Sequence, residues 1–121
     1  MKQKTVKVTT DNKISLIDVD FGNFKSIQQA IGGHFETVRT QLMVDYFNDT
    51  SVIMLVDEEG LIKELPVNTL GCALYGTLQH GCPIVGNLIF ARIIGEDIVA
   101  PDDPETLKDR LLHTFMGLQE A

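Results

Sequence analysis

Apolar and polar residues alternate near the start of the chain in the pattern of β-strands. Residues 5–10 alternate β-branched with polar side chains, and a second apolar segment at residues 14–17 follows the turn residues Asp11 and Asn12. A period of two residues places alternate side chains on opposite faces of a strand. The pattern therefore predicts a hairpin or two short strands.

The pattern changes to a helical period over residues 23–31. Apolar side chains stand at positions 24, 27, 30 and 31, which lie on one face of a helix. Gly22 or Asn23 would cap the first turn, because its backbone N–H groups lack partners within the helix. Gly32 and Gly33 would end this short amphipathic helix, since glycine readily adopts a left-handed conformation.

Three segments in the middle of the chain predict further strands. Residues 34–46 alternate imperfectly, as in a strand or a strand with a bulge. Residues 51–56 form a nearly continuous apolar run, as in a strand that is covered on both faces. The acidic turn at residues 57–60 predicts a hairpin whose second strand is residues 61–65.

The last part of the chain predicts a strand between two helical segments. Residues 69–76 favour one or two helical turns, and residues 83–94 favour a central strand with a kink at Gly86. We interpret residues 96–101 as a linker. Residues at about 103–118 then predict a helix that begins at Asp102 or Asp103, with Pro104 near its first turn.

The C-terminal helix carries an apolar stripe that can cover the sheet or meet a second copy of itself. Its members are Leu107, Leu111, Leu112, Phe115 and Leu118. Together the elements predict a single α+β domain over residues 1–121, with a core at about 14–95. We expect a mainly antiparallel sheet of five or six strands, an early short helix and a C-terminal amphipathic helix.

Composition narrows the classes of partner. The 17 Asp and Glu residues against 10 Lys and Arg residues give a net charge of −7, which disfavours general nucleic-acid binding. The N-terminus has no apolar leader and no apolar run could cross a bilayer, so we expect a cytoplasmic protein without membrane attachment. Cys72 and Cys82 are expected to be reduced thiols, with a disulfide between them as the alternative.

The chain has no recognisable set of catalytic or metal-binding residues. His34, His80 and His113 lie in different predicted elements, and no His or Cys spacing is that of a metal site. Glycines recur every five residues from Gly71 to Gly86, but they form no nucleotide-binding loop. We therefore expect no metal, no cofactor and no enzymatic activity, and a function in binding.

Three arginines and two aromatic residues are the candidates for ligand binding. The planar guanidinium groups of Arg39, Arg92 and Arg110 can hold a phosphate or a carboxylate in a bidentate manner. Arg92 follows an apolar run, so its charge must reach solvent, an ion-pair partner or a ligand. Phe90 and Tyr75 could stack on a base or a ribose, or else belong to the core.

Several short motifs occur in an order that is shared with a known family. They are a helix that ends in Gly-Gly, an acidic turn, a Pro-x-Asn segment, a Leu-Tyr-Gly segment and an Ile-Val-Gly segment, at residues 26–36, 57–60, 65–68, 73–76 and 83–87. In this order they resemble a family of small domains of unknown function that is found mainly in phages, plasmids and their bacterial hosts. On this resemblance Asn68 joins the candidate ligand-binding residues. The chain departs from the family in having Thr69 where an arginine is common, and in its C-terminal helix.

A looser similarity, in size, strand-rich core and flanking helices, is to the anti-Thoeris sponge proteins of phages. Those proteins bind cyclic nucleotide signals of bacterial immunity. The similarity implies a homo-oligomeric protein, assembled through the C-terminal helix or the sheet, that sequesters a nucleotide-like ligand with its arginines and aromatic residues. The alternative is a protein-interaction module that inhibits or adapts a host protein.

Overall fold

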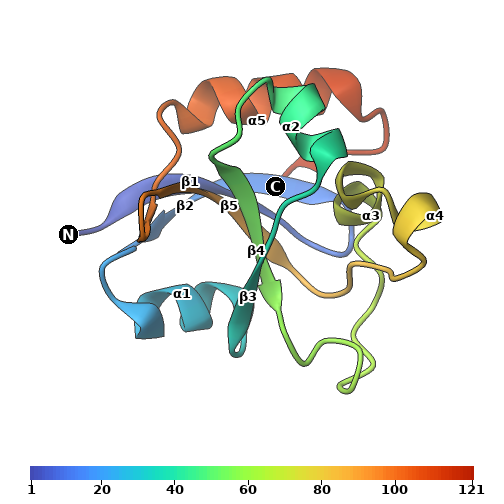
Figure 1. Cartoon of the computed structure of the whole chain (residues 1–121), viewed down its shortest axis with the longest axis horizontal. Coiled ribbons are helices and arrows are strands. Elements are labelled where there is room, and N and C mark those ends of the chain that lie inside the picture. Colours follow the sequence, from blue (N-terminus) through green and yellow to red (C-terminus); the bar gives the residue numbers. More distant parts are fainter.

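A twisted sheet with helices on both faces forms the body of the molecule in the computed structural model, which describes residues 1–121 (Figure 1). The sheet has seven strands in the order β3-β4-β5-β1-β2-β7, and β6 pairs with β5. The strands are β1 (Gln3–Val8), β2 (Lys13–Val19), β3 (Phe35–Val38), β4 (Val52–Asp57), β5 (Leu88–Ile94), β6 (Asp97–Val99) and β7 (Gln119–Glu120). Because β2 and β7 are parallel and the other pairs antiparallel, the sheet is mixed. The α+β class is confirmed, with seven strands in place of five or six.

Two hydrophobic cores lie on the two faces of this sheet. The helices are α1 (Phe24–Ile31), α2 (Gln41–Phe47), α3 (Thr69–Tyr75), α4 (Thr77–His80) and α5 (Pro104–Thr114). Helix α1 covers one face, and α2, α3 and α5 cover the other (Figure 1). Strand β4 supplies Ile53 and Leu55 to the α1 core and Met54 and Val56 to the other core, as its continuous apolar run predicted. None of the helices has the length and apolar character to span a membrane.

The first hairpin and the first helix form as the sequence predicted. Strands β1 and β2 pair in register from Gln3 with Val19 to Val8 with Ile14. The side chain of Asn23 caps α1 by accepting a hydrogen bond from the N–H of Lys25 at 3.0 Å. Gly32 ends the helix in the left-handed conformation, at a φ of 96°. The short helix predicted before Gly76 is also present, as α3.

A helix replaces most of the strand that was predicted over residues 34–46. Strand β3 ends at Val38, and α2 begins at Gln41. The Thr40 hydroxyl caps α2 by accepting from the N–H of Met43 at 3.3 Å. The side chain of Met43 is completely buried in the core. The prediction of one continuous strand is wrong because this cap and the burial of Met43 favour a helical turn.

The predicted hairpin strand at residues 61–65 is absent, and residues 58–66 form a loop instead. The N–H of Leu65 donates to the carbonyl of Gly60 at 3.0 Å, and Glu64 has a φ of 57°, which strands do not adopt. Strand β4 already has β3 on one side and β5 on the other. The prediction is wrong because β4 offers no free edge to residues 61–65.

The C-terminal segment differs from its predicted form at both ends. The linker predicted at 96–101 contains β6, and α5 ends at Thr114 rather than near 118. Asp103 caps the helix by accepting from the N–H of Thr106 at 3.1 Å. Leu111 and Leu118 are buried in the core of the same chain, and β7 then pairs with β2. The apolar stripe therefore covers the chain's own sheet.

The buried side chain of Asn68 joins three separate segments of the fold. Its Oδ1 accepts from the N–H of Gly71 at 3.0 Å and so caps α3. Its Nδ2 donates to the carbonyl of Val8 at 3.1 Å and to that of Gly86 at 3.0 Å. The side chain has no solvent-accessible surface. The structure thus gives Asn68, a predicted ligand-binding residue, a structural role, because its amide is used within the fold.

Replacement of this residue tests how strongly the fold depends on it. We expect Asn68→Ala to lower the free energy of unfolding by about 3 kcal/mol, because it leaves buried backbone groups without partners. Asn23→Ala, which removes one exposed cap, should cost about 1 kcal/mol. Urea denaturation measures both values. Equal losses in the two variants would contradict the central role of Asn68.

Candidate functional site

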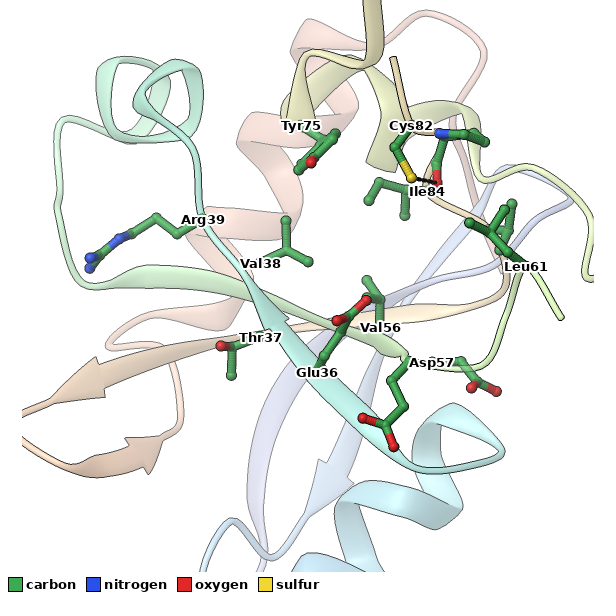
Figure 2. Close-up of a pocket in the computed structure, with 13 residues that line it drawn as sticks. Glu36, Thr37, Val38, Arg39, Val56, Asp57, Leu61, Tyr75, Cys82 and Ile84 are labelled. Atoms are coloured by element: carbon green, nitrogen blue, oxygen red, sulfur yellow. Dashed lines mark hydrogen bonds between the residues drawn. The ribbon is translucent and has the colours of Figure 1, made fainter. Parts of the chain in front are cut away.

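A cleft of about 330 Å³ lies beside β3, on the face of the sheet that α3 covers (Figure 2). Its walls are β3 with Arg39, the end of β4, loop 58–66, the end of α3 and residues 82–85. The volume is that of a site for a small ligand or a few side chains, which begins at about 300 Å³. We call this hollow the β3 cleft.

The β3 cleft has an apolar floor and an acidic rim. Val38, Val56 and Ile84 line the floor, and the carboxylate of Glu36 points into the hollow from β3 (Figure 2). Neither Glu36 nor Glu58, a second lining residue, has an ion-pair partner. These two free carboxylates attract a cation and repel a phosphate.

An ion pair between a buried carboxylate and a partly exposed lysine holds the loop that forms one wall of the β3 cleft. The carboxylate of Asp57 is 1% exposed, and its Oδ2 lies 2.8 Å from Nζ of Lys63. Its Oδ1 accepts from the N–H of Glu59 at 2.8 Å. The hydrogen bond to Asp57 raises the pKa of Lys63 above its ordinary value. Lys63 therefore stays charged at neutral pH and ties loop 58–66 to the end of β4.

Gly33 leaves room for this ion pair. A Cβ atom on residue 33 would lie 2.5 Å from Nζ of Lys63 and 2.8 Å from Oδ2 of Asp57. Atoms at these separations overlap, so any larger residue would displace the pair. This close approach explains the glycine at position 33, whereas Gly32 is needed for the left-handed end of α1.

Two of the predicted ligand-binding residues, Arg39 and Tyr75, line the β3 cleft. The guanidinium of Arg39 extends away from the hollow and donates to the carbonyl of Thr50 (Figure 2). The ring of Tyr75 lies 4.9 Å from that of His80, centroid to centroid. The structure thus brings the two residues to one site but directs the positive charge of Arg39 elsewhere.

Phe90 is completely buried in the middle of the sheet. Its ring packs edge to face on Phe47, with 6.0 Å between the centroids. No face of the ring is open to a base or a ribose. Of the two roles expected for Phe90, stacking on a ligand or packing in the core, the structure shows the second.

The other two arginines meet in a second hollow of about 180 Å³, which we call the arginine cavity. Nε of Arg92 donates to the carbonyl of Ala100 at 3.0 Å, and its Nη2 lies 3.1 Å from Asp102. Arg110 donates to the carbonyl of Tyr46, and its Cζ lies 4.4 Å from the centroid of that ring. Both guanidinium groups thus have partners within the chain.

Three carboxylates offset the two positive charges of the arginine cavity. They belong to Asp49, Asp102 and Asp103. Hydrogen bonds from Ser51 lower the pKa of Asp49, and hydrogen bonds from Thr106 lower that of Asp103. Both groups are therefore ionised at neutral pH. The cavity has no excess of positive charge for a phosphate.

A third hollow, which no sequence pattern predicted, adjoins the β3 cleft at the end of α3. This groove of about 390 Å³ is largely apolar, and Leu42, Ala73 and Leu78 are among its lining residues. Tyr75 lines the β3 cleft, and the next residue, Gly76, lines the groove. We call it the α3 groove. Its residues come from α2, α3 and α4, which only the fold brings together.

The remaining candidates for chemistry are the thiols. Cys72 and Cys82 are both free. Sγ of Cys72 accepts from the N–H of Ile84 at 3.3 Å, so this thiol helps to hold the chain beside α3. No three His, Cys, Asp or Glu side chains are grouped as metal ligands.

Sequence reasoning missed Glu36 and the apolar floor of the β3 cleft as site residues. A glutamate between Phe35 and Thr37 in a short alternating segment is the usual pattern of a solvated strand. The only available signal was that such charged, short strands often lie at a sheet edge. Its closeness to Tyr75 and residues 82–85 depends on tertiary structure.

Comparison with known proteins identifies one family. The model of the family described as Domain of unknown function (DUF3846) matches residues 1–112. The match includes most of α5, so the prediction that the C-terminal helix departs from the family pattern is wrong. No curated protein and no solved structure matches the chain.

The ion pair of Lys63 is tested by Lys63→Met, with Lys4→Met as the matched control. Lys4 lies 3.0 Å from Asp18, but both side chains are exposed. We expect only Lys63→Met to lower the melting temperature at pH 7, because it leaves the buried Asp57 unpaired.

The difference between wild type and Lys63→Met should also depend on pH. Because the pKa of Lys63 is raised in the folded state, its stabilisation is complete below the ordinary value of 10.5. It is lost as the pH rises through the higher, folded-state pKa. Thermal melts at increasing alkaline pH measure this convergence, and a gap that stays constant would contradict it.

Proposed function

We propose that this chain, which belongs to the family Domain of unknown function (DUF3846), is a binding module that recognises another protein. The binding surface comprises the β3 cleft and the adjoining α3 groove. The motif resemblance to phage- and plasmid-borne domains suggests a host protein as the partner and the host cytoplasm as the place of action.

The observation that carries this proposal is a set of exposed apolar side chains at or next to the two hollows. We call it the apolar rim; its members are Leu42, Leu61, Ile62, Val67 and Leu78. Ile62 follows Leu61 on loop 58–66, and Val67 pairs with Val85, which lines the β3 cleft. Leu61 lines the β3 cleft, and Leu42 and Leu78 line the α3 groove. Soluble proteins rarely expose grouped large apolar side chains except where a partner covers them. Ile62 is 82% exposed and Leu78 is fully exposed, so neither supports the core.

The charge of the β3 cleft favours a protein over a nucleotide. Glu36 and Glu58 are unpaired, and the one arginine at the cleft is turned toward Thr50. A basic side chain of a partner can pair with these carboxylates, whereas a phosphate would be repelled. Apolar hollows with a charged rim are the common anatomy of protein interfaces.

Serine substitutions in the apolar rim test the proposal. We expect Leu61→Ser and Leu78→Ser to abolish co-purification of a stoichiometric partner from host lysate, because each removes apolar surface from the interface. Ile94→Ser is the matched control, since Ile94 is 50% exposed against 56% for Leu61 and lies on β5, away from both hollows. Equal recovery from all three variants, or no partner for the wild type, would contradict the proposal.

A nucleotide-like ligand is the second candidate. The observation that favours it is the meeting of Arg92 and Arg110 at one cavity. A ligand there would have to displace Asp102 from Arg92 and compete with the surrounding carboxylates. Its phosphate would then accept hydrogen bonds from the guanidinium groups.

Calorimetry and thermal shift with cyclic nucleotides and ADP-ribose isomers test this second candidate. If a nucleotide is the ligand, it should raise the melting temperature of the wild type, and Arg92→Ala should remove the effect. Arg39→Ala, at the β3 cleft, should leave it unchanged. A panel that gives neither heat nor shift excludes the nucleotide candidate and leaves the protein-binding proposal standing.

A further inference from the structure

Strand β3 lies at the end of the sheet and has β4 as its only neighbour. Side chains on a strand alternate between the two faces of the sheet. Four consecutive residues from Glu36 to Arg39 nevertheless line the β3 cleft. The backbone of β3 as well as its side chains therefore borders the cleft.

The register shows which backbone groups point toward that free edge. Phe35 pairs with Asp57, and the N–H of Glu58 donates to the carbonyl of His34 at 3.0 Å. In an antiparallel pair, directly opposed residues exchange hydrogen bonds at every second position. Residues 34, 36 and 38 thus bond to β4, and the N–H and C=O groups of Phe35 and Thr37 point outward.

The hydrogen bonds between β4 and β5 lead to the same assignment of inward and outward backbone groups in β3. The N–H of Ile93 donates to the carbonyl of Ser51 at 2.8 Å, which fixes the alternation between β4 and β5. By that alternation Ile53 and Leu55 bond to β5, and Met54 and Val56 bond to β3. Glu36 and Val38, the register partners of Val56 and Met54, therefore direct their backbone groups inward.

The side chains of β3 add a charge pattern to this open edge. Glu36 and Val38 lie on the face that α3 covers, because their register partners Val56 and Met54 belong to the core on that face. The carboxylate of Glu36 points into the β3 cleft (Figure 2), and Val38 contributes to its floor. Glu58 lies at the same end of the cleft, beside Asp57. A strand beside β3 would meet an apolar position and an acidic position in alternation.

We infer that the outer edge of β3 accepts an extended segment of the partner protein as an additional strand. The inference rests on the proposed function. Phe35 and Thr37 offer two N–H and two C=O groups to the added strand. A Lys or Arg of the segment pairs with Glu36 and Glu58, and an apolar side chain two residues away lies over Val38.

Charge selects a basic segment of a different protein over a second copy of this chain. Each chain has a net charge of −7. Pairing of β3 with β3 of another copy would bring two sets of Glu36 and Glu58 to one edge. A four-residue strand with charged side chains also resists open-ended pairing of identical chains. The same carboxylates favour a partner of opposite charge.

A synthetic eight-residue peptide with lysine at positions 1 and 5, valine at positions 3 and 7 and threonine between them is the probe, because it places lysine and valine alternately on one face of the added strand. The counterpart with glutamate in place of lysine is the control. We expect the lysine peptide to bind, with an affinity that falls as salt is added. It should slow the hydrogen exchange of the Phe35 and Thr37 amides, measured by NMR, more than that of the Glu36 and Val38 amides, which already bond to β4. The glutamate peptide should do neither. A lysine peptide that binds without protecting Phe35 and Thr37, or that does not bind, overturns the inference.

Two variants distinguish strand pairing at β3 from non-specific electrostatic attraction between the basic peptide and the acidic protein. Thr37→Pro removes an outward N–H and leaves the hydrogen bonds to β4 in place, so it should weaken binding of the lysine peptide at least about tenfold. Glu36→Lys should lose the lysine peptide and gain the glutamate peptide, a gain that an unfolded variant cannot show. Failure of either expectation contradicts the inference.

The outcome also separates this inference from the proposed function. If Leu61→Ser abolishes partner capture and Thr37→Pro does not, the protein-binding module stands and strand addition at β3 is wrong. If Phe35 and Thr37 are protected from exchange without peptide and sedimentation shows a dimer, a second copy occupies the edge and the inference is overturned.

Discussion

The buried amide of Asn68 is the constraint on which the arrangement of the functional surface depends. It starts α3 by capping the helix, and it holds the carbonyls of Val8 and Gly86 on either side. A primary amide suits this place because it donates and accepts in one plane, so that strand, loop and helix are fixed by one side chain. Helix α3 then carries Tyr75 to the β3 cleft and Gly76 to the α3 groove. The two hollows adjoin because one buried residue positions the element between them.

The opposite wall of the β3 cleft depends on a second buried polar group. The carboxylate of Asp57 is 1% exposed, and its negative charge is compensated by Lys63 and by the N–H of Glu59. A buried carboxylate without such partners would be costly, so the ion pair favours the attachment of loop 58–66 to the end of β4. Leu61 and Ile62 are thereby held outward on an ordered loop. Exposed apolar side chains on an ordered loop lose little conformational entropy when a partner covers them.

The three arginines show that a residue type that is rare in a chain need not bind a ligand. Arg39, Arg92 and Arg110 each donate to a backbone carbonyl of the same chain. A guanidinium has five N–H donors and is often used to satisfy carbonyls where a loop meets a helix or a strand. The unpaired charges at the β3 cleft are instead the carboxylates of Glu36 and Glu58. Because the unpaired charges at the cleft are negative, a basic protein segment fits it better than an anionic nucleotide does.

The sequence by itself determined the elements whose signals are local. Hairpin β1–β2, helix α1, the core strand β4 and the start of α5 to within one residue follow from side-chain period and capping chemistry. The structure then chose Asn23 over Gly22 and Asp103 over Asp102 as the caps. Tertiary structure decided the rest, because it decided which edges were free. Residues 61–65 have a strand-like pattern but no unpaired neighbour, while β3 is a short strand whose outer edge stays open. Competition for hydrogen-bonding edges involves residues far apart in the chain, and no local pattern records its outcome.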